Sequence, residues 1–359
     1  MTAFTFNTPE LILLSATGIL FVIQLCYYFG LYNRILKLNK SALKNEVSYS
    51  NEMPPLSVIL CARNEADHLR DLLPALLEQD YPQFEVIVIN DASTDETEDI
   101  LKLLETQYSH LYHSFTPDSA RYISHKKLAL TLGIKASKYD WLVFTETNCM
   151  PSSKNWLRTM ARNFAPQTQI VLGYSGYQRT KSWLNKRISF DSLFQSMRYL
   201  GFALIGKPYM GIGRNIAYRK ELFFNQKGFS RYLNLQRGED DLFINHIATG
   251  SNTRVEASPD AMIRIRPMSY YNEWKDEKIN YRVTSHYYHG SQRYILGTET
   301  FTRLLFYAAF IAAIVLGCIH QHWFVAGIGL LGGYLSMMSK DDLSFLSFFT
   351  QVFETIAFK

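Results

Sequence analysis

The chain has 359 residues, of which 47% are hydrophobic and 14% aromatic, and it carries a formal net charge of +5. That length suits one large domain or two small ones, with enough apolar residues for a core and for contact with a membrane. The small positive charge is not gathered in one patch, which argues against a nucleic-acid-binding protein. The 4 cysteines lack metal or disulfide spacing, so a reducing compartment fits them best.

An uncharged stretch near the N-terminus, residues 11–32, is long enough to cross a bilayer as a helix. No Lys or Arg precedes it, so it lacks the basic start of a cleavable signal. The basic residues that follow it directly are Arg34, Lys37, Lys40 and Lys44. By the positive-inside rule they place the N-terminus outside and the rest of the chain in the cytoplasm. We therefore predict a transmembrane helix within residues 1–33 and a basic linker over residues 34–55; the alternative is a buried helix of a soluble domain.

The next stretch predicts a parallel sheet. Residues 56–61 and 84–89 are short apolar runs, partly β-branched, as in strands buried on both faces. Between them, leucines over residues 69–77 recur at the spacing of one helix face, and residues 93–96 are rich in capping side chains ahead of a second helix. Strand, helix, strand, helix forms a right-handed parallel unit, whose ligands bind beyond the carboxyl ends of the strands.

Two polar loops, residues 62–65 and 90–93, follow these strands and should meet at that edge of the sheet. Neither contains the glycines of a Rossmann dinucleotide site or a P-loop, which argues against both. Glu65 and Asp91 could instead accept hydrogen bonds from a base edge or from ribose hydroxyls. The alternative is that Asp91 and its polar neighbours only cap the next helix.

These loops resemble the opening of family 2 glycosyltransferases, which have a GT-A fold and use nucleotide-sugar donors. The resemblance rests on Arg63-Asn64-Glu65 after the first strand and on Asn-Asp-Ala-Ser-Thr-Asp at residues 90–95 after the second. The first Asp of the family's Asp-Asp pair is Asn90 here. The resemblance implies that the nucleotide sugar is bound by Ala62, Asn64, Glu65 and Asp91.

Residues 125–137 predict a helix and residues 141–145 a strand, which leads into a third polar loop. In a parallel sheet this loop joins the first two at one edge. Lys126, at the start of the helix, aligns with a family lysine and is a candidate to contact the phosphate of the nucleotide. The alternative is a solvated lysine at a helix terminus.

The third loop resembles the family pattern Thr-Asp-Ala-Asp-Cys-x-Pro, and the match is anchored by Thr145, Cys149 and Pro151. In the family the two carboxylates bind ribose and a divalent metal, Mg²⁺ or Mn²⁺, which bridges the diphosphate and offsets charge on the leaving group. Their positions hold Glu146 and Asn148 here. The resemblance thus adds Glu146 to the nucleotide-sugar site. Because these metals prefer a carboxylate to a neutral amide, Asn148 is a weak candidate metal ligand.

Further along, residues 170–177 predict one strand, and residues 209–218 form a glycine-rich segment that suits close approach of the backbone. Within that segment Arg214 and Asn215 offer hydrogen-bond donors for an anionic or sugar ligand. A Gly-x-Gly-Arg-Asn segment of this kind is familiar among membrane-bound members of the family.

The carboxylate cluster at residues 238–242 carries the strongest chemical implication. Sugar transfer with inversion needs a base that takes the proton of the incoming hydroxyl, and adjacent carboxylates repel one another, which raises at least one pKa. The resemblance implies that Asp240 is this base and that Glu239 helps to place the acceptor. Asp241 would hold the loop or cap the following helix. The alternative is that all three serve the first turn of that helix.

Residues 270–288 predict a helix with aromatic residues on one face, suited to packing or to a membrane interface. The family has a Gln-x-x-Arg-Trp motif near this place, which aligns with residues 277–281. The motif's arginine, which supports the diphosphate, is Asn280 here, and Lys278 or Arg282 could substitute for it. Asn lacks the charged fork of Arg.

Residues 304–338 carry no charged side chain and predict two transmembrane helices within residues 301–340, joined by a short outside turn. Basic residues on both flanks keep those flanks cytoplasmic. The tail, residues 341–359, is apolar and is a candidate interfacial helix. The soluble domain is then predicted over residues 56–295.

Taken together, the patterns predict an α/β, GT-A-like domain with a mostly parallel sheet flanked by helices, on the cytoplasmic side of an inner (plasma) membrane that the chain crosses several times. The implied function is inverting transfer of a sugar from a nucleotide donor, UDP-linked first and GDP-linked second, to a lipid-linked or growing glycan of the cell envelope. Membrane lipid is an expected partner.

An alternative from another class is a weakly active or inactive relative that binds nucleotide or scaffolds a glycan-assembly complex. Asn148 and Asn280 favour it, because both replace charged groups near the expected diphosphate. A channel or transporter is disfavoured, since three helices with no buried charged residue offer no pathway.

Overall fold

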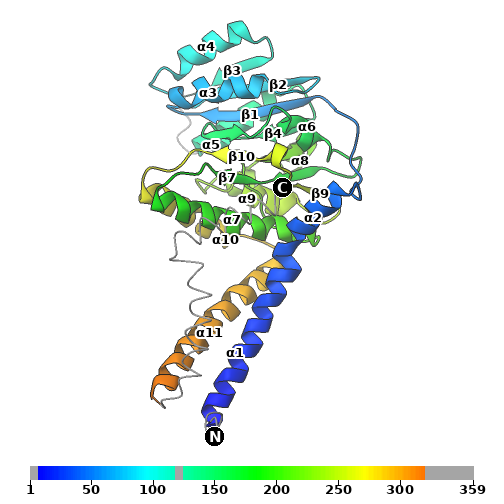
Figure 1. The fold of residues 1–359 in the computed structure, drawn as a ribbon. Coiled ribbons are helices and arrows are strands. Elements are labelled where there is room, and N and C mark those ends of the chain that lie inside the picture. Colours follow the sequence, from blue (N-terminus) through cyan, green and yellow to red (C-terminus); the bar gives the residue numbers. More distant parts are fainter. Residues whose placement is uncertain (1–6, 118–123, 320–359) are drawn as a thin grey trace.

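A seven-stranded sheet in the order β3-β2-β1-β4-β8-β6-β9 forms the centre of the computed structural model, which describes residues 7–117 and 124–319 (Figure 1). Its strands are β1 Leu56–Ala62, β2 Phe84–Asn90, β3 Leu111–Phe115, β4 Trp141–Phe144, β6 Ile170–Gly173, β8 Ile216–Arg219 and β9 Thr253–Glu256. β1 pairs in parallel with β2 and β4, and β2 pairs in parallel with β3, so the predicted parallel unit is confirmed. β8 runs antiparallel to β4 and β6.

A second sheet contains three strands in the order β5 Cys149–Pro151, β10 Ile263–Ile265, β7 Ser175–Tyr177. The prediction of one strand over residues 170–177 is wrong, because the chain passes from the large sheet to the small one at Tyr174. The Tyr174 carbonyl accepts hydrogen bonds from the Ile263 N–H at 3.2 Å and from Asn215 Nδ2 at 2.8 Å. These partners lie far away in the sequence, so the apolar run itself does not reveal the break.

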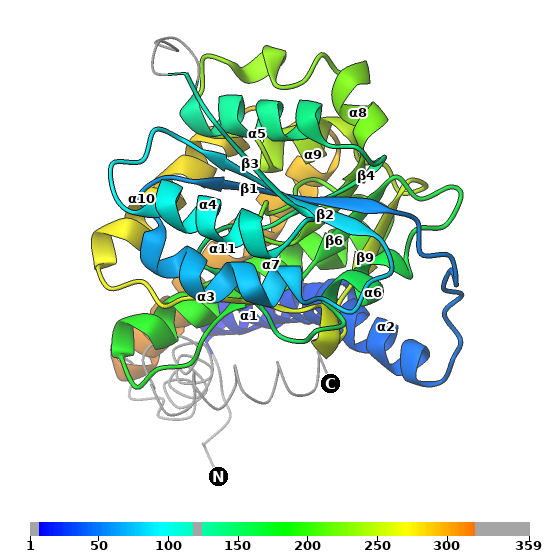
Figure 2. The ribbon, with the colours of Figure 1, turned by 90° about the horizontal axis from the view of Figure 1, so that it is seen from above.

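Helices cover both faces of the large sheet (Figure 2). They are α3 Ala66–Leu77, α4 Thr97–Gln107, α5 His125–Ala136, α6 Trp156–Ala161, α7 Trp183–Leu204, α8 Lys220–Asn225, α9 Asp241–Ile247 and α10 Tyr271–Ser285. One hydrophobic cluster packs α3, α4 and α6 on one face, and another packs α5, α7 and α9 on the opposite face. Within β1, Val58 faces the first cluster and Ile59 the second, as the alternation of a strand buried on both faces requires.

The N-terminal helix continues into the domain. α1 Thr8–Tyr27 leads through a π-helical turn, Tyr28–Tyr32, into α2 Asn33–Leu43. Part of the expected linker over residues 34–55 is therefore helical. The reason is an apolar face on α2, since its Ile35 is fully buried among side chains of the cluster that includes α7.

The long helices α1 and α11 Gln292–Ile319 lie side by side and project away from the sheets (Figure 1). Among the described residues, Thr8–Leu43 and Gln292–Leu316 are long and apolar enough to cross a membrane. Gln24 Nε2 donates to Thr302 Oγ1 at 2.9 Å between the two helices. The second helix expected within residues 301–340, and the tail at residues 341–359, fall on residues 320–359, outside the described part of the chain.

A buried carboxylate fastens this helix pair to the domain. Glu299 of α11 accepts a hydrogen bond from the Tyr32 hydroxyl at 3.0 Å and pairs with Arg198 of α7 at 2.7 Å. Its side chain is also 3.3 Å from Arg303, one turn further along α11. Glu299 is only 2% exposed, and burial of an unpaired carboxylate would be costly. The three partners offset its negative charge.

Gly201 of α7 lies against the N-terminal helix, and a Cβ there would be 2.9 Å from the carbonyl oxygen of Leu31. Because that oxygen belongs to the backbone, we expect Gly201→Ala to lower the melting temperature through an overpacking cost of about 1–3 kcal/mol. Gly18→Ala in α1 is the matched control, since nothing lies within 4 Å of its Cβ and alanine favours helix. Equal melting temperatures for the two variants would contradict the close approach.

Candidate active site

Three loops meet at the carboxyl edge of β1, β2 and β4, where they line a cleft of about 730 Å³. The parallel register pairs Ala62 with Asn90, so the residues that follow these two positions are neighbours. The expected rim residues Glu65, Asp91 and Glu146 all line the cleft. So do Lys126, Asn148 and the segment at residues 233–237.

Hydrogen bonds between the first two loops set their shape. The Asp91 N–H donates to the Ala62 carbonyl at 2.7 Å, and Asn64 Oδ1 accepts from the Thr94 N–H at 2.8 Å. Asp95 accepts from the Ala66 N–H at 3.1 Å at the start of α3. Ala62, Asn64 and Asp95 thus shape the rim, and the capping alternative describes Asp95 well.

Asp91 has a different environment from its capping neighbours. Its carboxylate is buried and accepts a hydrogen bond from Thr116 Oγ1 at 2.7 Å. His125 Nδ1 lies 3.2 Å from the same oxygen, and Arg63 lies 3.8 Å from the other. Asp91, His125 and Arg63 also line the cleft, so this group is placed to contact a ligand there.

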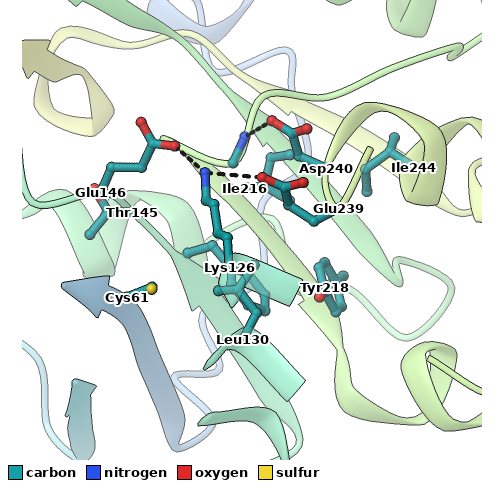
Figure 3. A pocket seen from close by; sticks show the side chains of 12 residues that line it. Cys61, Lys126, Leu130, Thr145, Glu146, Ile216, Tyr218, Glu239, Asp240 and Ile244 are labelled. Atoms are coloured by element: carbon teal, nitrogen blue, oxygen red, sulfur yellow. Dashed lines mark hydrogen bonds and ion pairs between the residues drawn. The ribbon is translucent and has the colours of Figure 1, made fainter. Parts of the chain in front are cut away.

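Lys126 joins two carboxylates that come from distant parts of the chain (Figure 3). Its Nζ lies 2.7 Å from Glu146 Oε1, after β4, and 3.1 Å from Glu239 Oε1, before α9. Although burial alone would raise the pKa of Glu146, Lys126 and Arg214 hold that pKa well below its ordinary value. Burial disfavours the charged form of Lys126, yet Glu146 and Glu239 raise its pKa above the ordinary value. Both partners therefore stay charged.

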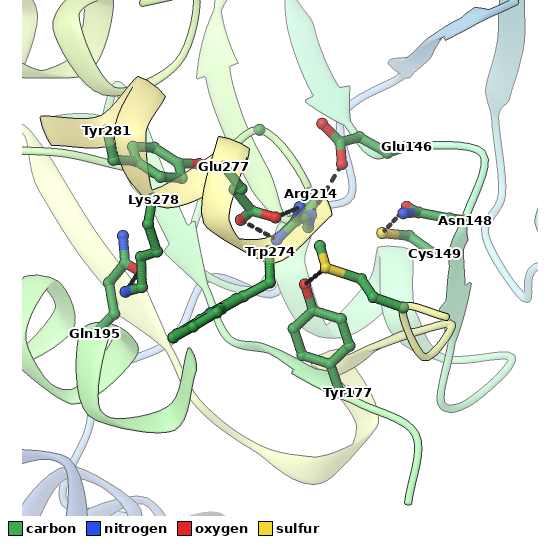
Figure 4. A network of polar contacts seen from close by, with 12 residues as sticks. Glu146, Asn148, Cys149, Tyr177, Gln195, Arg214, Trp274, Glu277, Lys278 and Tyr281 are labelled. Carbon is green, nitrogen blue, oxygen red and sulfur yellow. Dashed lines mark hydrogen bonds and ion pairs between the residues drawn. The ribbon is translucent and has the colours of Figure 1, made fainter. Parts of the chain in front are cut away.

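Arg214 extends this chain of ion pairs (Figure 4). Its Nε donates to Glu146 Oε2 at 2.9 Å, and its two terminal nitrogens lie 3.1 and 2.9 Å from the Glu277 carboxylate oxygens. Such a two-pronged contact fixes both the position and the plane of the guanidinium. Glu277 of α10 is thereby tied to the rim of the cleft.

Two candidates from the same sequence segments point elsewhere. Asn215 is buried, and its side chain binds the Tyr174 and Ala261 carbonyls, each at 2.8 Å, as an internal brace. Lys278 points to α7, where its Nζ lies 2.5 Å from Asp191 and 3.3 Å from Gln195 Oε1 (Figure 4). Neither residue lines the cleft.

Asp240 lies next to the Lys126 pair, in a smaller cavity of about 40 Å³ that Lys126 and Glu146 also line (Figure 3). Its carboxylate accepts hydrogen bonds from the N–H groups of Gly213 at 2.9 Å and Asp241 at 2.8 Å. The Tyr281 hydroxyl of α10 lies 3.4 Å from Oδ2. Burial and the Glu239 carboxylate raise the pKa of Asp240 above its ordinary value, against the effect of Lys126.

Asp241 points away from Asp240 and joins α9 to α10. Its carboxylate accepts hydrogen bonds from the hydroxyls of Thr284 and, at 2.7 Å, Tyr288. The Leu242 N–H donates to its other oxygen at 2.8 Å. Burial and the charge of Asp240 raise the pKa of Asp241 to about 7. Asp241 therefore connects α9 to Thr284 and Tyr288 and also accepts from the first turn of its own helix.

Lys127 is a site residue that the sequence analysis missed. It is 1% exposed, and its Nζ donates to the carbonyls of Tyr232, Leu235 and Arg237 at 2.6, 2.6 and 2.9 Å. Leu235 and Arg237 belong to the segment at residues 233–237, which lines the cleft. A signal was present, because Lys127 falls on the helical stripe of the buried residues Leu130 and Ile134.

The donor set at the third loop does not fit a divalent metal. Both Glu146 oxygens are taken by cationic side chains, and Asn148 Oδ1 lies 3.1 Å from the Cys149 thiol. Among residues 7–117 and 124–319, no group of three or more His, Cys, Asp or Glu side chains could hold a metal ion. Hard cations such as Mg²⁺ need several free oxygen ligands, which these residues do not offer.

Because Lys127 supplies the hydrogen bonds for three carbonyls, we expect Lys127→Met to loosen the segment at residues 232–237. Unpaired buried acceptors cost about 1–3 kcal/mol each, so amide hydrogen exchange there should speed up well before that of α3. Lys135→Met is the matched control on the same helix, where the side chain is exposed. Unchanged exchange in the segment of the Lys127 variant would contradict this role.

The family sequence model described as "Glycosyl transferase family 2" matches residues 57–224. Among curated relatives, a poly-beta-1,6-N-acetyl-D-glucosamine synthase of Staphylococcus epidermidis is 28% identical over 126 residues, which cover 35% of this chain and 28% of that protein. The probable glycosyltransferase YdaM of Bacillus subtilis is 26% identical over 182 residues, 48% of this chain and 42% of that protein. These matches span less than half the length of the relatives.

Among solved structures, the mannosyltransferase PcManGT from Pyrobaculum calidifontis, in complex with GDP-Man and Mn²⁺, covers 97% of both chains with a TM-score of 0.62 and 18% identity. At that identity the likeness shows the fold, which is the expected GT-A-like one. Residues 57–224 of the chain thus match glycosyl transferase family 2, and the fold agrees with that match.

Proposed function

We propose that this protein is an inverting glycosyltransferase, which moves a sugar from a nucleotide-diphosphate donor to a lipid-linked or growing glycan acceptor at a membrane. The observation that carries the proposal is the position of Asp240. Its half-buried carboxylate lies beside the Lys126–Glu146 pair, which borders the large cleft. A base and a donor-sized cleft are thus next to each other.

The cleft suits a nucleotide sugar in size and lining. A volume of about 730 Å³ falls within the range of small-molecule sites. Asp91 offers an acceptor for ribose or base, while Arg63, His125 and Lys126 supply positive or proton-donating groups for the phosphates. We place UDP-linked donors first and GDP-linked donors second; PcManGT was solved with GDP-Man.

The chemistry requires one base. The acceptor hydroxyl attacks the anomeric carbon while Asp240 takes its proton, and the bond from that carbon to the donor's phosphate oxygen breaks with its electron pair on the nucleoside diphosphate. The raised pKa of Asp240 brings this carboxylate closer to the pKa of a useful base. Glu239 lies beside Asp240 in the same small cavity and pairs with Lys126 at 3.1 Å, so its charge acts on the surroundings of the base.

The helices support a membrane-side acceptor. α1 and α11 expose many large apolar side chains, among them Leu11, Ile19, Phe301 and Ile311. α10, which carries Tyr281 beside Asp240, ends just before α11 begins. With the basic residues after α1 on the cytoplasmic side, this arrangement fits a multi-pass protein of an inner membrane whose domain works on a lipid-linked glycan.

A second candidate function is a silent relative that binds nucleotide or scaffolds a glycan-assembly complex. The observation that favours it is Asn148, a neutral residue at the place of a family carboxylate, together with the two ion pairs that occupy Glu146. Such a protein would bind nucleotide and transfer nothing, so turnover separates the two functions.

Asp240→Asn removes the base and keeps the shape of the side chain. We expect transfer from UDP- or GDP-linked sugars to polyprenyl-phosphate glycans to fall by about 10²–10⁴-fold, while nucleotide binding measured by calorimetry stays intact. Asp260→Asn, at an exposed position away from the cleft, is the control and should transfer at the wild-type rate. Wild-type transfer by the Asp240 variant would refute the role of this residue, and no transfer by the wild type with any donor would favour the silent relative.

A further inference from the structure

The charges around the expected diphosphate differ from those of a metal site. Where a metal would need free carboxylates, Lys126 already lies between Glu146 and Glu239. Arg214 takes the second oxygen of Glu146. A divalent cation that entered this place would be repelled by two fixed positive charges and would have to displace them from their partners.

Lys126 still has capacity to bind an anion. An ammonium group has three N–H donors, and Lys126 pairs with two carboxylates. Its side chain is 27% exposed, and it lines the cleft. A phosphate oxygen in the cleft can therefore reach this ammonium without breaking either ion pair.

A second cation, Arg237, lines the cleft near Lys126, and both side chains approach Glu239 Oε1. The Arg237 side chain is 52% exposed, lines the cleft, and approaches Glu239 only to 3.8 Å. Its backbone carbonyl is bound by the buried Lys127 at 2.9 Å, so the base of this side chain has a fixed position. Arg237 thus presents an exposed charged side chain to the cleft from a backbone position that Lys127 holds.

We propose that Lys126 and Arg237, in place of a divalent metal, neutralise the diphosphate of the donor. This inference rests on the proposed function. As the bond between the anomeric carbon and the phosphate oxygen breaks, that oxygen keeps the electron pair, and the two side chains stabilise the negative charge of the departing nucleoside diphosphate. The proton of the acceptor hydroxyl goes to Asp240, so no further reagent is needed.

Nucleotide binding tests the proposal separately from turnover. UDP and GDP are titrated into the detergent-solubilised full-length protein by calorimetry, once with EDTA and once with Mn²⁺. For whichever nucleotide binds more tightly, UDP or GDP, we expect the dissociation constants in EDTA and in Mn²⁺ to agree within about 2-fold. Binding that appears only with Mn²⁺ would overturn the proposal and leave the transferase function standing, whereas absence of binding in both buffers would overturn both.

The variant Arg237→Gln keeps a polar side chain at this position and removes its charge. We expect it to weaken nucleoside-diphosphate binding in EDTA by about 10-fold or more, as the loss of a charge-assisted contact implies, with little change for the uncharged nucleoside. Arg231→Gln is the matched control, because Arg231 lies on the same segment, is exposed, and does not line the cleft. Equal affinities for the two variants would overturn the role of Arg237.

Asn148→Asp adds the family's carboxylate but leaves both Glu146 oxygens paired with Lys126 and Arg214. Its negative charge should weaken nucleoside-diphosphate binding in EDTA, and Mn²⁺ should not restore it. If Mn²⁺ restored the affinity of Asn148→Asp, the two cations would not exclude a divalent metal, and the proposal would fail.

Discussion

The contact between Lys126 and Glu146 determines how the parts of this site lie together. Glu146 follows β4, and Lys126 lies in the first turn of α5, the helix that precedes β4 in the sequence. Glu239 precedes α9, which Asp240 caps. One ammonium therefore joins the rim of the cleft to the segment that carries Asp240, the proposed base. Without the Lys126 cation, the carboxylates of Glu146 and Glu239 would lie near each other with less positive charge to offset them. Burial of such charges is costly in a protein interior.

The ion pairs continue from that contact to α10, the helix that precedes α11. Arg214 connects Glu146 to Glu277, on the helix whose Tyr281 reaches Asp240. α10 thus contributes Glu277 to the series of ion pairs and Tyr281 to the surroundings of Asp240. The position of α10 therefore determines both the Arg214–Glu277 pair and the contact of Tyr281 with Asp240.

The sequence analysis anticipated the parts of the fold that depend on local pattern. The buried strands β1, β2 and β4 and the edge where their loops meet follow from short apolar runs and from the chirality of parallel units. The break at Tyr174 and the pairing of Arg214 with Glu277 depend on contacts between distant segments, which spacing does not reveal. Lys278 illustrates the same limit, because one step along α10 separates a side chain that faces the site from one that faces α7.

The account as a whole claims that one carboxylate, Asp240, acts as a base across from a donor held at the rim, with no protein nucleophile between them. The stereochemistry of the product tests this most directly. When proton NMR follows the reaction with a donor whose sugar is α-linked to the nucleotide, the account predicts a β-linked sugar in the first product formed. An α-linked product would contradict it, because retention requires a different arrangement of groups around the anomeric carbon.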